Sequence, residues 1–221
     1  MVVLFFNERG NILLNKYFSN VDIKIMLNIL TNFPSLSYSF STSDKIIVGD
    51  KTKYFKVFKK MYAKISSKEN NLNNESVEKE LNLMPIKEVN NLKSYLNNNN
   101  LEIQKLFMIG NNKNLLKFKN KLLKKLGDKV RITDSGVNNL EINSHDVSKG
   151  LALEYLANIL NISLKQTMAF GDSANDIDLM ETAGVSIVMS NSNLDILKEK
   201  ADIIAPSHDN DGVAKILSRL Y

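Results

Sequence analysis

The stretch from Met168 to Met180 sets the strongest limit on how this chain can fold. Three apolar residues, too few for a helix, end in Gly171-Asp172, and the start of an amphipathic helix follows. This order predicts a buried strand, a loop and a helix. Ligands of open α/β sheets bind at the carboxyl ends of the strands. We therefore expect Asp172 and Asp176 to project into a ligand site. The alternative is an Asp helix cap followed by a solvated turn.

The chain after Ser135-Gly136 alternates between short apolar runs and segments with helical spacing. Strands are predicted at 140–142, 168–170, 185–189 and 202–204, and helices at 149–160, 177–183, 194–200 and 213–220. Near-continuous apolar strands that alternate with helices are typical of a doubly wound α/β sheet. Residues 136–221 are therefore predicted to form an α/β domain.

The first 135 residues have a different pattern. Apolar runs on both sides of Glu8-Arg9-Gly10 predict a β-hairpin within residues 1–18, because Gly supplies the left-handed turn. Beyond the hairpin, helical spacing over 21–33, 54–65 and 115–126 mixes with predicted strands at 36–40, 46–48, 105–109 and 130–133. This mixture predicts an α+β domain over residues 19–135.

Paired carboxylates indicate a metal at the end of the predicted strand 168–170. Asp172 and Asp176 are close enough in the sequence to share one cation. Hard carboxylate oxygens, with water completing the shell, suit Mg²⁺ better than a softer metal. The sequence therefore predicts a Mg²⁺ site at this edge of the sheet.

The hexapeptide from Gly171 to Asp176 (Gly-Asp-Ser-Ala-Asn-Asp) resembles the metal-binding motif of the haloacid dehalogenase-like hydrolases. The flanking sequence resembles their Cof-type branch of sugar-phosphate and nucleotide phosphatases. Val147-Ser148-Lys149-Gly150 is similar to the lysine motif of that family, at the usual distance. Three further segments also match: Ala183-Gly184-Val185, Met189-Ser190-Asn191 and residues 209–214. The resemblance is dense from about Leu140 to the C-terminus and only architectural before it.

This resemblance implies a half-Rossmann core with an inserted α+β cap. Residues 1–18 would be a hairpin associated with the core, 19–135 the cap, and 136–221 the C-terminal half of the core. The family's first motif, an Asp-x-Asp near the N-terminus, does not occur upstream of Lys149. We therefore expect an incomplete core that lacks the opening βα units, on the order of 60–80 residues at roughly 30 residues a unit.

The resemblance also implies roles for individual residues. In this family an aspartate attacks phosphorus and Mg²⁺ bridges that aspartate and the phosphate, so catalysis is mostly positioning and charge neutralisation. Asp172 and Asp176 would hold the metal, with Asp172 as the direct ligand. Lys149 would neutralise the nucleophile and the phosphate. Asn175 would orient the loop or a ligand oxygen. Asn191 is a further candidate, although serines replace the small residues that flank it in the family's Met-Gly-Asn-Ala.

The amino-acid composition limits the classes of molecule that we expect this chain to bind. The chain has no Cys and no apolar run near the roughly 18–20 residues of a membrane span, so we expect a cytoplasmic protein that does not bind membranes. The net charge of +5 raises the question of nucleic acid. The positive charge comes almost entirely from lysine. Proteins that recognise bases and phosphates favour arginine instead, because its planar guanidinium group can bind two acceptors at once. We expect a small phosphorylated metabolite as the partner instead.

The absent nucleophile motif leaves three interpretations of function. In the first, the chain is the cap and C-terminal core of a Cof-type Mg²⁺-dependent phosphomonoesterase. It would be inactive alone, and its open sheet would self-associate or bind an N-terminal companion segment. In the second, it is a non-catalytic metal- or phosphate-binding or assembly protein derived from the family. In the third, it is the product of a broken gene. The substrate cannot be read from the sequence, because the cap that sets it carries no transferable motif.

Overall fold

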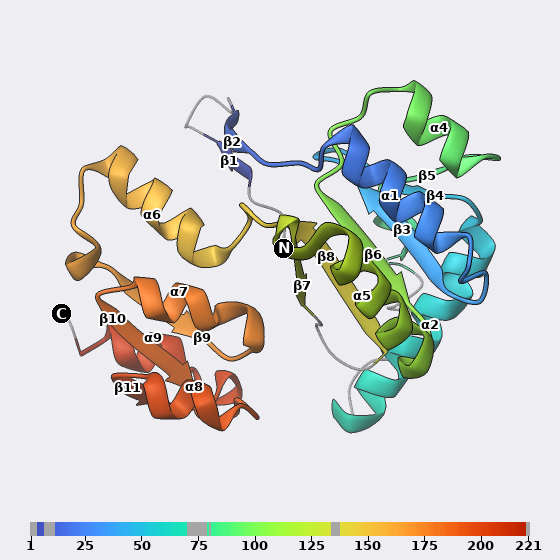
Figure 1. Cartoon of the computed structure of the whole chain (residues 1–221). Coiled ribbons are helices and arrows are strands. Elements are labelled where there is room, and N and C mark those ends of the chain that lie inside the picture. The colour runs from blue at the N-terminus through green and yellow to red at the C-terminus, as the bar shows by residue number, and fades with distance from the viewer. Residues whose placement is uncertain (1–3, 7–11, 70–78, 80, 134–137, 220–221) are drawn as a thin grey trace. The chain divides into compact units, whose positions relative to one another are not determined.

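The computed structural model describes residues 4–6, 12–69, 79, 81–133 and 138–219. The chain divides into two compact units, Val2–His145 and Asp146–Tyr221. Figure 1 draws the first from blue to yellow-green and the second from yellow to red. In the described part of the chain, no helix is both long and apolar enough to cross a lipid bilayer.

A six-stranded mixed sheet organises the larger unit, in the order β5-β4-β3-β6-β8-β7. Only β4 and β5 are parallel, and the other neighbouring pairs are antiparallel. In chain order the strands are β3 (Ser37–Ser41), β4 (Ile46–Val48), β5 (Ile86–Glu88), β6 (Lys105–Ile109), β7 (Val130–Thr133) and β8 (Asn139–Ser144). A separate antiparallel pair, β1 (Leu4–Phe6) and β2 (Ile12–Asn15), confirms the predicted hairpin. Its predicted turn at residues 8–10 lies outside the described residues.

The main core of the larger unit lies between this sheet and the helices α1 (Asn20–Leu30), α4 (Leu92–Asn98) and α5 (Asn112–Leu126). α5 shows how the sequence specifies these helices. Asn111 caps it by accepting a hydrogen bond from the Asn114 N–H. Its buried residues recur at helical spacing: Leu115, Phe118, Leu122 and Leu126. α2 (Lys51–Glu69) packs against β3 and β6, where Phe58 meets Phe107.

The smaller unit contains a three-stranded parallel sheet in the order β11-β10-β9, with helices against both faces. Its strands are β9 (Met168–Gly171), β10 (Val185–Met189) and β11 (Ile203–Ala205), and its α-helices are α6 (Lys149–Leu160), α7 (Ile177–Thr182), α8 (Asp195–Lys200) and α9 (Gly212–Leu217). Ile187 packs with Ile216 of α9, and Val188 packs on the other face with Met180 and Leu197. This arrangement confirms the predicted doubly wound α/β pattern.

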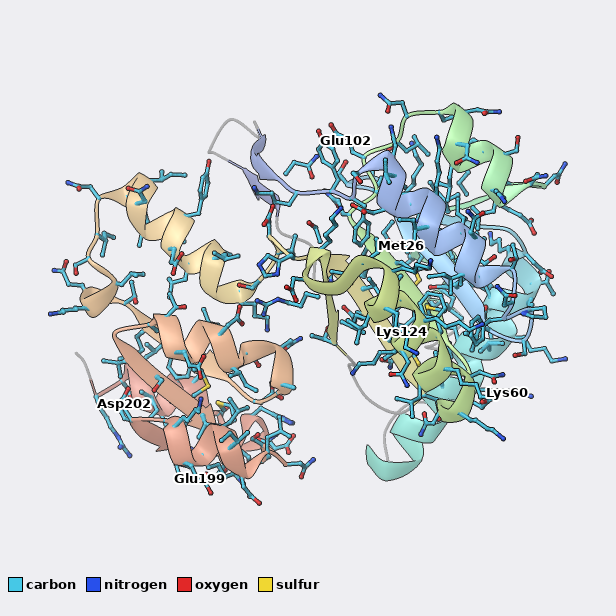
Figure 2. All side chains as sticks on the ribbon, viewed as in Figure 1. Met26, Lys60, Glu102, Lys124, Glu199 and Asp202 are labelled. Carbon is cyan, nitrogen blue, oxygen red and sulfur yellow. The ribbon has the colours of Figure 1, made fainter. Side chains whose placement is uncertain are left out.

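A side-chain bridge fixes the start of β11 against β10. Asp202, labelled in Figure 2, accepts hydrogen bonds from both the N–H and the hydroxyl of Ser186, each at 2.8 Å. The hydroxyl in turn accepts from the Asp202 N–H at 3.1 Å. Short parallel strands are thereby held in register at the end opposite to the candidate site.

The structure differs from the predicted organisation at strand 140–142, which was expected to open the α/β domain. That strand is part of β8, which pairs antiparallel with β6 and β7 in the sheet of the larger unit. The division of the chain accordingly falls after His145 rather than after residue 135. The reason is visible in the sequence: Leu140 and Ile142 alternate with polar neighbours, the pattern of a strand with one face in a core.

Candidate active site

The loop after β9 carries the predicted metal residues. β9 ends at Gly171, Asp172 follows on the surface, and a 3₁₀ turn, η3 (Ala174–Asp176), brings Asp176 back into the interior at 2% exposure. Only glycine fits at position 171, because an added Cβ would lie 2.7 Å from the Cβ of Asp176. The Gly-Asp step therefore lets the chain fold back so that both aspartates lie at the carboxyl end of β9.

The Asp176 carboxylate is held by donors on both of its oxygens. Oδ2 accepts hydrogen bonds from the N–H groups of Asp172 and Ser173 and from the Ser173 hydroxyl, each at 3.1 Å. Oδ1 is paired with Nζ of Lys149. Burial alone would raise the pKa of Asp176, but the hydrogen bonds from Lys149 and from the two backbone N–H groups outweigh it. The pKa is lowered from its ordinary value, so this carboxylate is charged at neutral pH.

Lys149 reaches Asp176 because α6 starts close to α7. Ser148 caps α6 by accepting a hydrogen bond from the Leu151 N–H at 3.1 Å. The next turn needs a glycine, since a Cβ on Gly150 would lie 2.6 Å from the backbone oxygen of Asp178. The Gly150 N–H also donates to the Asp178 carboxylate at 3.3 Å. The Lys-Gly pair thus has a structural reason: the glycine permits the approach and the lysine forms the ion pair.

Asp172 provides the free carboxylate of the site. Its side chain is exposed and has no hydrogen-bond partner among the described residues. The same part of the chain contains no cluster of three His, Cys, Asp or Glu side chains that could enclose a metal. One free carboxylate and one donor-bound carboxylate in the same loop fit a hydrated Mg²⁺ that keeps most of its waters, and not a cation that needs a closed protein cage.

The predicted asparagines occupy two different places. The Asn175 side-chain oxygen accepts from the Ser173 hydroxyl at 2.6 Å and lies 3.5 Å from Nζ of Lys149, so it belongs to the ion-pair cluster. Asn191 follows β10, the strand next to β9, and its side-chain oxygen accepts from the backbone N–H of His208 at 3.2 Å. Asn191 therefore joins two loops at the same edge of the sheet. His208 is exposed.

Two residues of the site were not identified from the sequence. Ser173 donates to both Asn175 and Asp176, and Asp178 binds the start of α6. Ser173 lies between the two aspartates, where a hydroxyl can cap a short turn, and this spacing was the available signal. The role of Asp178 depends on contact between α6 and α7, which no local pattern specifies.

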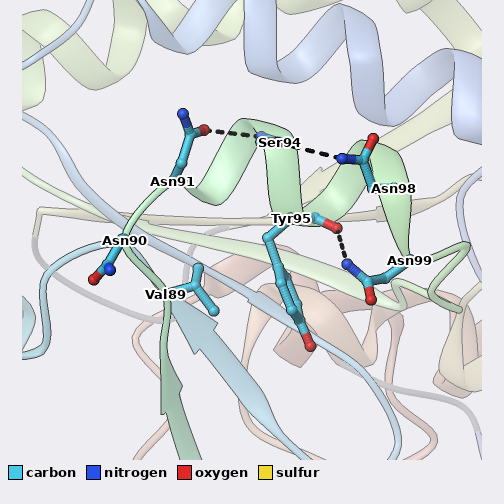
Figure 3. A pocket seen from close by; sticks show the side chains of 7 residues that line it. All are labelled: Val89, Asn90, Asn91, Ser94, Tyr95, Asn98 and Asn99. Carbon is cyan, nitrogen blue, oxygen red and sulfur yellow. Dashed lines mark hydrogen bonds between the residues drawn. The ribbon is translucent and has the colours of Figure 1, made fainter.

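A shallow hollow of about 310 Å³ lies elsewhere, in the larger unit beside α4. Figure 3 shows that three of its asparagine side chains are engaged locally. Asn91 accepts from the Ser94 N–H, Asn98 donates to the Ser94 hydroxyl, and Asn99 donates to the Tyr95 carbonyl. These bonds complete the ends of α4, so the hollow is explained by helix capping and is not the candidate site.

Curated relatives match part of the chain. A putative phosphatase of Buchnera aphidicola from Acyrthosiphon pisum is 40% identical over 122 residues, which is 54% of this chain and 44% of that protein. The phosphoglycolate phosphatase of Archaeoglobus fulgidus is 42% identical over 100 residues, which is 45% of this chain and 43% of that protein. The chain thus matches less than half the length of these relatives.

The fold and the family are shown by two further comparisons. A solved haloacid dehalogenase-like hydrolase from Bacillus subtilis superposes with a TM-score of 0.80 at 21% identity, covering 99% of this chain and 76% of its own. The family model of the haloacid dehalogenase-like hydrolases matches residues 3–217. The α/β fold with core and cap sheets, predicted from the motifs, is confirmed, and the chain belongs to the haloacid dehalogenase-like hydrolase family.

Proposed function

We propose that residues 146–221 form the Mg²⁺- and phosphate-binding part of a Cof-type phosphomonoesterase that acts on a small phosphorylated metabolite, such as a sugar phosphate. The observation that carries this proposal is the Lys149–Asp176 ion pair, whose carboxylate also binds the backbone N–H of Asp172, a residue with an exposed carboxylate of its own. Two acids and one ammonium group gather at the carboxyl end of a parallel strand, where α/β folds bind ligands. The names of the partial relatives, which are phosphatases, agree with this reaction class.

The charges of the site suit phosphoryl transfer. A Mg²⁺ ion would supply charge neutralisation at the phosphoryl oxygens, and Asp172 would hold it. The Lys149 ammonium is held by Asp176 and about one third of its side chain is exposed, so it can also bind an incoming phosphate oxygen. Asp176 binds both Lys149 and the backbone N–H groups of residues 172 and 173, so it fixes the ammonium group and the backbone that carries Asp172. Asn175 completes the orientation of that loop.

No residue of this site is assigned as the catalytic nucleophile. The sequence contains no Asp-x-Asp upstream of Lys149, and Asp172 and Asp176 are assigned to the metal and to Lys149. We infer that the chain alone binds but does not hydrolyse phosphomonoesters. The same sequence observation favours a second candidate function, in which the protein is not catalytic but retains the family's site for binding a metal or a phosphate.

The metal assignment predicts that Asp172 controls a weak response to Mg²⁺. Asp172→Asn removes the free carboxylate, and Mg²⁺ gives up its waters too reluctantly to bind without it. In the wild type, we expect Mg²⁺ to slow hydrogen exchange in peptides that cover residues 168–180. The effect should be lost in Asp172→Asn and kept in the matched control Glu199→Gln on the exposed surface of α8. Equal protection in all three proteins would contradict the assignment.

The nucleophile inference predicts no turnover by the chain alone. Covalent catalysis divides a difficult displacement into two easier steps, and without a nucleophile the remaining groups only bind and polarise. Release of phosphate from p-nitrophenyl phosphate with Mg²⁺ should equal that of buffer. Mg²⁺-dependent turnover that disappears in Asp172→Ala would show that a nucleophile exists elsewhere in the chain.

A further inference from the structure

The outer helical layer of the larger unit, made of α1, α4 and α5, is strongly basic. Its three helices carry eight lysines and a single acidic residue, Asp22. α1 and α4 supply one lysine each, and α5 supplies the other six: Lys113, Lys117, Lys119, Lys121, Lys124 and Lys125. The smaller unit has the opposite balance, because residues 146–221 contain 6 Lys and Arg against 11 Asp and Glu. Folding therefore gathers positive charge in one layer.

Four of the α5 lysines form a ladder of like charge along the helix: Lys113, Lys117, Lys121 and Lys125. They recur every fourth residue, about 6 Å apart along the axis, and like charges at this spacing repel each other. No ion pair between described residues involves a lysine of this layer. Lys93 donates to the Asn28 side-chain oxygen at 3.0 Å, and Nζ of Lys121 lies 5.3 Å from the ring centroid of Phe33, so both partners are neutral. An anionic partner would relieve the repulsion within the layer.

Exposed aliphatic side chains lie on the same helices as these lysines. Leu116 and Leu123 are 58% and 39% exposed, and their spacing of seven residues puts them on one side of α5. Val21, which is 63% exposed, lies one turn before Lys24 on α1. The phosphate backbone of a nucleic acid would contact the lysines but offers no apolar surface to the aliphatic groups, whereas the interface of an anionic bilayer offers both. The combination therefore favours a bilayer.

α2 provides a comparison on the opposite face of the sheet. It packs on Phe107, whose neighbours Leu106 and Met108 are in the main core, and successive residues of a strand face opposite sides. α2 is also rich in lysine, and Lys60 is labelled in Figure 2, but none of its described residues is a large apolar side chain that is exposed. Positive charge is thus common to both faces, and exposed aliphatic groups distinguish the outer layer from α2.

We propose that the layer of α1, α4 and α5 binds the surface of an anionic lipid bilayer, with the α5 lysines at the headgroups and Leu116 and Leu123 in the interface. The 15 residues of α5 span about 22 Å. α1 contacts both α4 and α5, so the layer is about 16–20 Å wide between its outer axes. Lysine suits such a partner, because a field of headgroups requires positive charge and not a bidentate fork.

This proposal is independent of the proposed phosphatase function. It departs from the expectation, drawn from the absence of a long apolar run, that the chain does not bind membranes. Binding at a membrane surface needs no apolar span, since basic side chains and a few aliphatic groups in the interface provide the affinity.

The test is sedimentation of the full chain with vesicles of phosphatidylcholine, either alone or with about 30% phosphatidylglycerol. The wild type should bind only the anionic vesicles, and about 0.5 M NaCl should release it. Each lysine near a membrane surface strengthens binding about fivefold, so Lys117→Gln with Lys124→Gln should weaken it about thirtyfold. Lys56→Gln with Lys60→Gln on α2 changes the net charge equally. This control should alter binding less than about twofold, because the sheet separates α2 from the layer by more than a Debye length.

A second paired variant separates a bilayer from other anionic partners. Leu116→Ser with Leu123→Ser keeps every charge and should weaken binding to anionic vesicles at least about tenfold. Hydrogen exchange of β6 checks that each variant is folded. The proposal is overturned if anionic vesicles are not bound, if the α2 pair weakens binding as much as the α5 pair, or if the serine pair changes nothing. Tighter binding to a DNA duplex than to anionic vesicles would also overturn it and would assign the layer to nucleic acid.

Discussion

Replacing Asp176 by alanine is expected to lower the free energy of unfolding of the smaller unit by about 2–4 kcal/mol. The carboxylate is buried and satisfies two backbone N–H groups, one hydroxyl and one ammonium. Removing it leaves these donors without their acceptor. The expected loss is set somewhat lower than the roughly 3–5 kcal/mol for a fully buried pair, because the Lys149 side chain is 36% exposed and water can solvate it.

The measurement is hydrogen exchange of the smaller unit in increasing urea, since the chain has no Trp to report unfolding. Asp172→Ala is the matched control: the same substitution four residues earlier removes an exposed carboxylate and should change stability by less than about 0.5 kcal/mol. If the two variants are equally stable, the Lys149–Asp176 cluster does not hold the loop together.

The lowered pKa of Asp176 also fixes the pH range of its contribution. An aspartate whose pKa is lower in the folded state stabilises that state above the pKa of the unfolded chain, about 3.9. This stability is lost as the pH falls through the folded-state pKa. The wild type should therefore lose stability more steeply below about pH 4 than Asp176→Ala does, and the two curves should run parallel near pH 7.

The sequence specified the site better than it specified the organisation of the chain. Three features of the site depend on only a few neighbouring residues, and can therefore be predicted from local sequence: the Gly171-Asp172 step, the Ser148 cap and the Lys149-Gly150 pair. In each, the interacting residue is near in the chain or the backbone conformation is special. For Asp176, the predicted role and the observed contacts differ in kind. The sequence predicted a metal residue, and the structure shows a carboxylate with donors on both oxygens, whose role toward Mg²⁺ stays a prediction.

The features that were not predicted all depend on contacts between distant segments. β8 was placed in the wrong sheet because its partners, β6 and β7, are specified by pairing and not by its own six residues. β5 was not predicted, since its three residues are mostly exposed and become a strand only beside β4. α4 runs to Asn98 although asparagine is a weak helix former, because Leu92 and Leu96 are buried and hold it. Tertiary packing overrides weak local propensity in each case.

Replacing Phe118 by alanine should lower the free energy of unfolding of the larger unit by about 3–5 kcal/mol. The side chain is fully buried in the middle of α5, and its ring meets that of Phe33 edge to face at 5.7 Å. Truncation loses the transfer free energy of the ring and leaves a cavity that helices packed on a sheet cannot close. Leu116→Ala is the control on the same helix, because Leu116 is 58% exposed and its loss should cost less than about 0.5 kcal/mol.

This substitution also tests where the candidate site resides. Lys149, Asp172, Asn175, Asp176 and Asn191 all lie in the unit Asp146–Tyr221, and the hydrogen bonds described above for the ion-pair cluster stay within it. In urea that unfolds the larger unit of Phe118→Ala but not of the wild type, Mg²⁺ should still slow exchange over residues 168–180. A response that disappears together with the larger unit would mean that residues 146–221 do not form the Mg²⁺ site by themselves. The assignment of the Mg²⁺- and phosphate-binding part to these residues would then be wrong.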